Sequence, residues 1–112
     1  MPQPNRSLGG SRAVYLLLPD VPALIATKAV VRGRVQGVGF RMAAAYRARG
    51  LALSGWVRNL PNGSVETVAQ GSHQAVDAYL AWLDQGPRGS AVIGVEKAPI
   101  AVDLSMSRFE VR

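Results

Sequence analysis

The sequence contains no cysteine, which excludes disulfide bonds, thiolate zinc sites, iron–sulfur clusters and a cysteine nucleophile. It contains a single histidine, His73, so a metal site built from several histidines is excluded as well. It also lacks an apolar run of the roughly 18 residues that would cross a bilayer. The nearest segment, residues 13–26, is interrupted by Pro19 and Pro22 and is not the unbroken stretch of a secretory signal. We therefore expect a protein of the reducing cytoplasm with no membrane-spanning segment.

Acidic residues are scarce beside basic ones. Seven Asp and Glu stand against thirteen Lys and Arg, which gives a net charge of +6 at pH 7. Eleven of the thirteen are arginine, whose planar guanidinium makes forked contacts with phosphate and carboxylate. This balance favours an anionic partner, such as phosphate, nucleic acid or an anionic membrane surface, without distinguishing among them. Arginines that only face water would be equally consistent with it.

The composition and length indicate one folded domain. With 48% hydrophobic and 18% charged residues, the 112-residue chain can bury a core of its own. Residues 1–25 differ from the rest, because they open with Pro, Asn, Ser and Gly and continue with an apolar run that ends at Pro19. We expect a flexible or loosely docked extension over residues 1–25 and a single domain over residues 26–112.

Beyond residue 26 the hydrophobic pattern predicts alternating strands and helices. The expected strands span residues 28–35, 52–58, 64–70, 91–97 and 108–111; the expected helices span residues 40–49 and 73–85. Ser72 is the expected N-cap of the second helix. This β-α-β-β-α-β order with a short fifth strand is the split βαβ, or ferredoxin-like, arrangement. We therefore expect an α+β fold, a mostly antiparallel sheet with two helices on one face.

Each predicted helix carries an apolar stripe that we expect to point toward the sheet. The two stripes are Met42, Ala45 and Tyr46, and Val76, Tyr79, Leu80 and Leu83.

The predicted topology brings two distant segments together. A right-handed crossover makes strands 28–35 and 52–58 parallel, with strand 64–70 between them. The C-terminal ends of the two parallel strands then lie at one edge of the sheet. We expect the loop over residues 36–41 to face Arg58 and Asn59 there.

The segment from Val35 to Arg41 has the features of an anion-binding loop. Two glycines lie between the end of a strand and the start of a helix, where main-chain N–H groups carry the positive end of the helix dipole. Glycine lets such a backbone wrap closely around an anion, and Arg41 can add a forked contact. A plain packing turn with an exposed arginine is the simpler alternative. The loop fits neither a dinucleotide fingerprint nor a Walker loop.

Most residues of the second segment, 55–63, have a purely structural explanation. Trp56 suits packing, and Pro61-Asn62-Gly63 is a strong turn signal. Asn59 is most simply a turn former, because asparagine readily bonds its own backbone. Its expected place opposite the Arg41 loop makes it a candidate for function as well.

Together these segments resemble the acylphosphatase family. Residues 31–41 read Val-Arg-Gly-Arg-Val-Gln-Gly-Val-Gly-Phe-Arg, and residues 55–61 read Gly-Trp-Val-Arg-Asn-Leu-Pro. The resemblance continues through residues 63–66, Gly86-Pro87 and the Phe-Glu-Val-Arg of residues 109–112, and so spans about residues 27–112. Asn62 departs from the aspartate that is common in the family.

The resemblance implies an enzyme that hydrolyses acyl phosphates to a carboxylate and inorganic phosphate. It implies that Arg41 binds the phosphate and that Asn59 positions the attacking water, so that both are catalytic. It implies a phosphate-binding loop of Gln36, Gly37, Val38, Gly39, Phe40 and Arg41. We expect no cofactor and no metal.

The chemistry of the residues agrees with this resemblance. A covalent phosphoenzyme has no evident carrier, because there is no cysteine and no Asp-x-Asp pair, and His73 is expected to be an exposed first-turn residue. Direct attack by water remains, and phosphoryl transfer can proceed on positioning and charge stabilisation alone. A carboxylate leaving group, whose acid has a pKa of about 4, needs neither a catalytic acid nor a metal.

Two other functions are considered. One is a non-catalytic anion-binding or regulatory module on the same scaffold. The other is RNA binding through surface aromatics, which is disfavoured because the chain has only seven aromatic residues. In addition, Gly37-Val38-Gly39-Phe40, which superficially resembles an RNA-recognition signature, lies in a loop, whereas that signature would lie on a strand. The expected partners are a small acyl phosphate and inorganic phosphate as product and inhibitor. We expect no nucleic acid or membrane partner, and a monomer.

Overall fold

The computed structural model describes residues 23–112. The elements are β2 (Leu24–Arg34), α2 (Phe40–Gly50), β3 (Ser54–Asn59), β4 (Val65–Ser72), α3 (His73–Leu83), β5 (Ala91–Ile100) and β6 (Phe109–Val111). Their order confirms the predicted β-α-β-β-α-β arrangement with a fifth strand. The predicted extension lies outside the described residues as far as residue 22, and β2 begins at Leu24. In this part of the chain no helix is long and apolar enough to cross a membrane.

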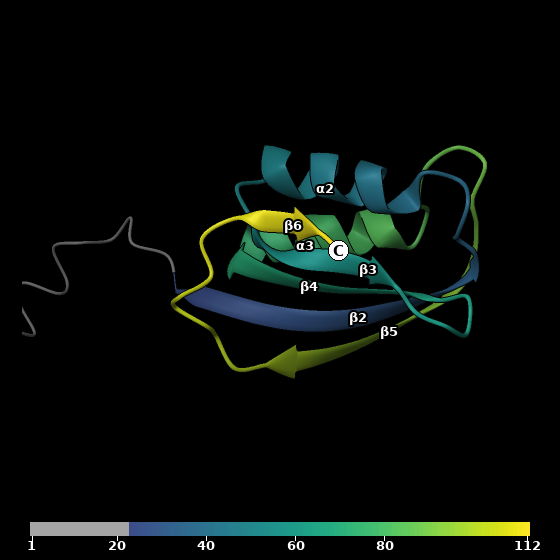
Figure 1. Ribbon diagram of the computed structural model, residues 1–112. Helices are drawn as coiled ribbons and strands as arrows, with labels where there is room; N and C mark the ends of the chain where they lie inside the picture. The colour runs from purple at the N-terminus through teal and green to yellow at the C-terminus, as the bar shows by residue number, and fades with distance from the viewer. Residues whose placement is uncertain (1–22) are drawn as a thin grey trace, which may run out of the picture.

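The five strands form one sheet in the order β5-β2-β4-β3-β6. β4 pairs antiparallel with both β2 and β3, so these two are parallel to each other, as the crossover predicts. β5 adds antiparallel to β2, and β6 adds parallel to β3, which makes the sheet mixed. Both helices lie on the same face of the sheet (Figure 1).

The longer bounds of β2 and β5 come from strand pairing. Leu24 and Ile25 pair with β4, and the rest of the extension pairs between β2 and β5. Their register runs from Ala26 opposite Ile100 to Arg34 opposite Ala91, with an irregularity at Arg32/Gly33. Each strand therefore extends beyond the residues predicted from its own apolar pattern. Ladder hydrogen bonds, rather than side-chain propensity, set these ends.

Helix α3 confirms its predicted stripe. Val76, Tyr79 and Leu83 are fully buried, and Leu80 packs against the core. The Ser72 Oγ accepts a hydrogen bond from the main-chain N–H of Ala75 at 3.2 Å, which confirms the predicted N-cap.

The predicted stripe of α2 is wrong at Met42 and Tyr46 and confirmed at Ala45. Met42 is 64% exposed and Tyr46 is 83% exposed. The residues of α2 that the core buries are Phe40, Ala44, Ala45 and Ala48. Because alanine has so little bulk, this face can sit close to the sheet, and the longer side chains point away from it.

A buried hydroxyl pair ties α3 to the middle of the sheet. The Thr67 Oγ1 lies 2.8 Å from the main-chain oxygen of Trp56 and 2.8 Å from the Tyr79 hydroxyl. Since threonine has one hydroxyl hydrogen and donates it to Trp56, the Tyr79 hydroxyl is the donor to Thr67. Burial raises the pKa of Tyr79, so its phenol stays protonated.

Candidate active site

The loop between β2 and α2 turns on two glycines in the left-handed region. Gly37 has a φ of 76° and Gly39 a φ of 77°. A Cβ at either position would meet no other atom within 4 Å, so glycine is favoured by the backbone conformation and not by crowding. Gly39 is the N-cap of α2; no side chain caps that helix, and its first turn holds no acidic residue. The positive end of the α2 dipole is therefore not neutralised within its own helix.

The loop and the end of β3 line one open pocket of about 170 Å³. A liquid water occupies about 30 Å³, so the pocket has room for a phosphoryl group and attendant water. Its lining consists of Val35, Gly37, Gly39, Phe40, Arg41, Met42, Asn59 and Val111. The structure thus brings Arg41 and Asn59 together, as the topology predicts. The lining contains one cation and no carboxylate, which suits an anion.

The end of the chain orients Arg41. Its Nη1 donates to the main-chain oxygen of Arg112 at 2.9 Å, the one hydrogen bond of this side chain within residues 23–112. Arg112 is itself held by its N–H, which donates to the main-chain oxygen of Val57 at 2.8 Å. A guanidinium carries five N–H groups, so donors of Arg41 remain for an anion in the pocket.

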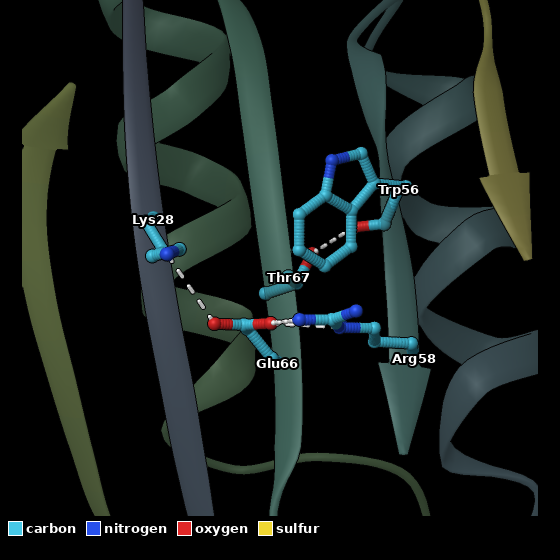
Figure 2. A network of polar contacts seen from close by, with 5 residues as sticks. All are labelled: Lys28, Trp56, Arg58, Glu66 and Thr67. Carbon is cyan, nitrogen blue, oxygen red and sulfur yellow. Dashed lines mark hydrogen bonds and ion pairs between the residues drawn. The ribbon is translucent and has the colours of Figure 1, made fainter. Parts of the chain in front are cut away.

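The face of the sheet away from the helices carries a network of charged residues beside this site. Glu66, 8% exposed, accepts a hydrogen bond from Arg58 Nε at 2.8 Å and lies 3.4 Å from Lys28 Nζ. The guanidinium of Arg58 also lies over the Trp56 ring, 5.1 Å from its centroid. Figure 2 shows Glu66 between Lys28 and Arg58. These contacts hold the C-terminal end of β3 from the face of the sheet away from the helices.

Asn59 follows Arg58 and ends β3 opposite Val65 of β4. Successive side chains of a strand point to opposite faces, so Asn59 lies on the helix side when Arg58 lies on the outer side. That is the side on which α2 begins. The arrangement explains how a residue with the sequence pattern of a turn former comes to line the pocket.

The side chains of three residues of the predicted phosphate-binding loop have partners within the protein. Gln36 Nε2 donates to the main-chain oxygens of Leu60 and Ser64, both at 2.8 Å, and is not part of the pocket lining. Val38 packs against the core. Phe40 lines the pocket but is 2% exposed, with its ring 5.6 Å from that of Trp82. The contact of this loop with phosphate through its main-chain N–H groups stays a prediction.

Other polar residues lie apart from the pocket. His73 is exposed on the first turn of α3 and lies 3.1 Å from Asp77, as expected of a first-turn residue. Within residues 23–112, no three His, Asp or Glu side chains gather where they could hold a metal ion. The contact of Arg112 with Arg41 was not predicted, and no pattern in the sequence indicates it.

The comparison with known proteins agrees with the two motifs. The family model described as Acylphosphatase matches residues 27–111. The chain belongs to the acylphosphatase family. The acylphosphatase of Methylococcus capsulatus is 49% identical over 82 residues, which cover 73% of this chain and 89% of that protein. The acylphosphatase of Paraburkholderia xenovorans is 44% identical over 95 residues, which cover 84% and 98%.

Solved acylphosphatase structures share the fold. The structure of an acylphosphatase from Coxiella burnetii matches with a TM-score of 0.76 at 39% identity, over 80% of this chain and 93% of that one. The resemblance drawn from the motifs and the predicted ferredoxin-like fold are therefore confirmed. Membership of this family carries acylphosphatase activity, so the pocket between the glycine loop and β3 is the candidate active site of an acylphosphatase.

Proposed function

We propose that the protein hydrolyses the carboxyl–phosphate anhydride of acyl phosphates in the pocket between the glycine loop and the end of β3. The observation that carries this assignment is that Gly37, Gly39, Arg41 and Asn59 line the same pocket. The loop supplies N–H donors and a cation, and the strand end supplies a neutral amide. These are the groups that hydrolysis by direct attack of water requires.

Arg41 and the loop amides hold the phosphoryl group. Its negative charge spreads over three oxygens in the transition state, and a forked guanidinium can contact two of them. The main-chain contact with Arg112 directs Arg41 before substrate arrives, so little freedom is lost on binding. Preorganised donors of this kind stabilise the charge that develops during transfer.

Asn59 orients the attacking water. Its amide does not titrate, so it cannot act as a general base, and it works by accepting and donating hydrogen bonds. The water attacks phosphorus, the bond between phosphorus and the carboxylate oxygen breaks, and the water proton passes to a phosphate oxygen. The products are a carboxylate and inorganic phosphate.

The lining of the pocket limits the substrate class. No side chain in it can protonate a leaving alkoxide. A carboxylate leaves without protonation, because its acid has a pKa of about 4. Acyl phosphates are therefore favoured over ordinary phosphate esters. We infer further that the protein works as a cytoplasmic monomer and that phosphate inhibits it as product; the absence of cysteine suits that compartment.

The test is hydrolysis of benzoyl phosphate by the purified protein with EDTA present. We expect turnover that EDTA leaves unchanged, and no turnover of a simple alkyl phosphate. In ¹⁸O-labelled water, the label should enter phosphate and not benzoate, because water attacks phosphorus. Binding of phosphate without turnover would instead indicate the non-catalytic module and would overturn the proposal.

A further inference from the structure

We propose that Gln36 is a positioning residue, which ties the glycine loop to the turn after β3 and thereby sets the place of Asn59. The inference rests on the proposed function of the pocket. It assigns the side chain of Gln36 a role beyond the membership of the phosphate-binding loop that the resemblance implied.

The two hydrogens of the Gln36 amide are both in use. Nε2 donates to the main-chain oxygen of Leu60 at 2.8 Å and to that of Ser64 at 2.8 Å. The remaining polar atom of the side chain, Oε1, is an acceptor and cannot bind a phosphate anion. A direct contact between this side chain and phosphate would require breaking at least one of the two bonds.

The bonds of Gln36 cross between two distant parts of the chain. The last paired residues of β2 and β4 are Val31 and Val65, so the ladder between these strands ends before the glycine loop begins. Among the described residues, the hydrogen bonds that join the loop of residues 36–41 to the turn of residues 60–64 both come from Gln36. One side chain therefore bridges the loop and the turn.

The turn that Gln36 holds begins directly after Asn59. It is closed by the N–H of Leu60, which donates to the main-chain oxygen of Ser64 at 2.9 Å, and by the N–H of Gly63, which donates to that of Leu60 at 3.2 Å. Gln36 donates to the same two carbonyl oxygens. Movement of the turn relative to the loop would shift Asn59 relative to Arg41, and catalytic geometry tolerates little displacement.

The test replaces Gln36 with methionine, which has a similar length and no N–H donor. We expect Gln36→Met to lower kcat on benzoyl phosphate at least tenfold, while the inhibition constant of phosphate changes less than threefold. Arg41 and the loop amides are intact in this variant, so the binding of phosphate should persist. A rise in that constant that matches the loss of kcat would make Gln36 a ligand and overturn the inference.

A matched control separates positioning from turn stability. Asn62 Oδ1 accepts a hydrogen bond from the Ser64 N–H at 3.0 Å, within the same turn but without a bond to the loop. Asn62→Ala should keep kcat within about twofold, because it loosens the turn without releasing it from the loop. An equal loss of kcat in Asn62→Ala and Gln36→Met would show that turn stability alone matters.

A double-mutant cycle tests whether Gln36 acts through Asn59. In an Asn59→Ala background, Gln36→Met should change the residual kcat less than twofold. If the Asn59→Ala background is too inactive to assay, NMR of the phosphate complex replaces the cycle. The chemical shift of the Asn59 side-chain NH₂ should then change more in Gln36→Met than in Asn62→Ala. Gln36→Ala repeats both measurements if the methionine variant does not fold. An additive cycle or an unmoved resonance would refute the inference, whereas an inactive wild type would refute the proposed function itself.

Discussion

The surroundings of Arg41 support the role in phosphate binding that we propose for it. It lies on the first turn of α2, at the uncapped positive end of that helix, and its guanidinium is directed by a main-chain oxygen of Arg112. The positive charge of Arg41, the positive end of the α2 dipole and the orientation of the guanidinium all favour an anion in the same pocket. An exposed surface arginine would have the charge alone.

We expect Arg41→Ala to weaken phosphate inhibition and to lower kcat together, because the guanidinium contacts the phosphoryl group in both the ground and the transition state. Arg41→Lys should recover little, since a point charge lacks the fork. The measurement is steady-state kinetics with phosphate as inhibitor. Recovery of kcat to near wild type by lysine would contradict a forked contact.

At the scale of the elements, the topology is what brings the site together. β2 and β3 flank β4, so the loop after β2 and the last residue of β3 lie at one edge of the sheet. Gly55 lies near the start of β3, at the end of the strand away from the site, where the backbone of β4 comes close. Gly55 has a φ of 141°, and a Cβ there would lie 1.9 Å from the main-chain oxygen of Val68.

We expect Gly55→Ala to destabilise the protein by at least about 2 kcal/mol, because it combines backbone strain with a clash against β4. Gly94→Ala is the control, since a Cβ at Gly94 in β5 meets nothing within 4 Å. Its effect should stay within about 0.5 kcal/mol. The measurement is urea unfolding of both variants. Equal losses of the free energy of unfolding would show that the close approach of Gly55 to β4 does not matter.

The sequence allowed the order of the three central strands, β2-β4-β3, and the meeting of Arg41 with Asn59 to be predicted, because a right-handed crossover leaves few alternatives. It did not allow the buried face of α2 to be predicted. The predicted stripe combined Ala45 with Met42 and Tyr46, which are large and exposed, whereas close packing buries Ala44 and Ala48 beside Ala45. The bonds of Gln36 and Arg112 could not be predicted either, because they depend on side-chain and main-chain geometry that leaves no periodic pattern.

At the scale of the whole molecule, the stability of the fold should depend on the buried hydroxyl of Tyr79. Burial raises its pKa above that of an unfolded tyrosine. The folded state therefore keeps the proton at a pH where the unfolded state has lost it. The stabilisation is fully present below the unfolded pKa of about 10 and is lost progressively as the pH rises above it.

From pH 8 to pH 11, ionisation of Tyr79 in the unfolded state should thus lower the free energy of unfolding by about 1.4 kcal/mol, for an unfolded pKa of about 10. Tyr79→Phe removes this group but leaves every other titrating residue in place. The difference in stability between the wild type and this variant should narrow by that amount over the same range. Urea unfolding at the two pH values makes the comparison, and a constant difference would contradict it.

We propose that the molecule separates the holding of phosphate, by Arg41 at the start of α2, from the orientation of water, by Asn59 at the end of β3, within one pocket. The most direct test is Asn59→Ala, assayed for kcat on benzoyl phosphate and for inhibition by phosphate after circular dichroism has verified folding. We expect kcat to fall by a few powers of ten, since orientation can contribute several kcal/mol, while the inhibition constant stays nearly unchanged. An Asn59→Ala variant that retains most of its kcat would contradict the account and leave Asn59 an ordinary turn residue.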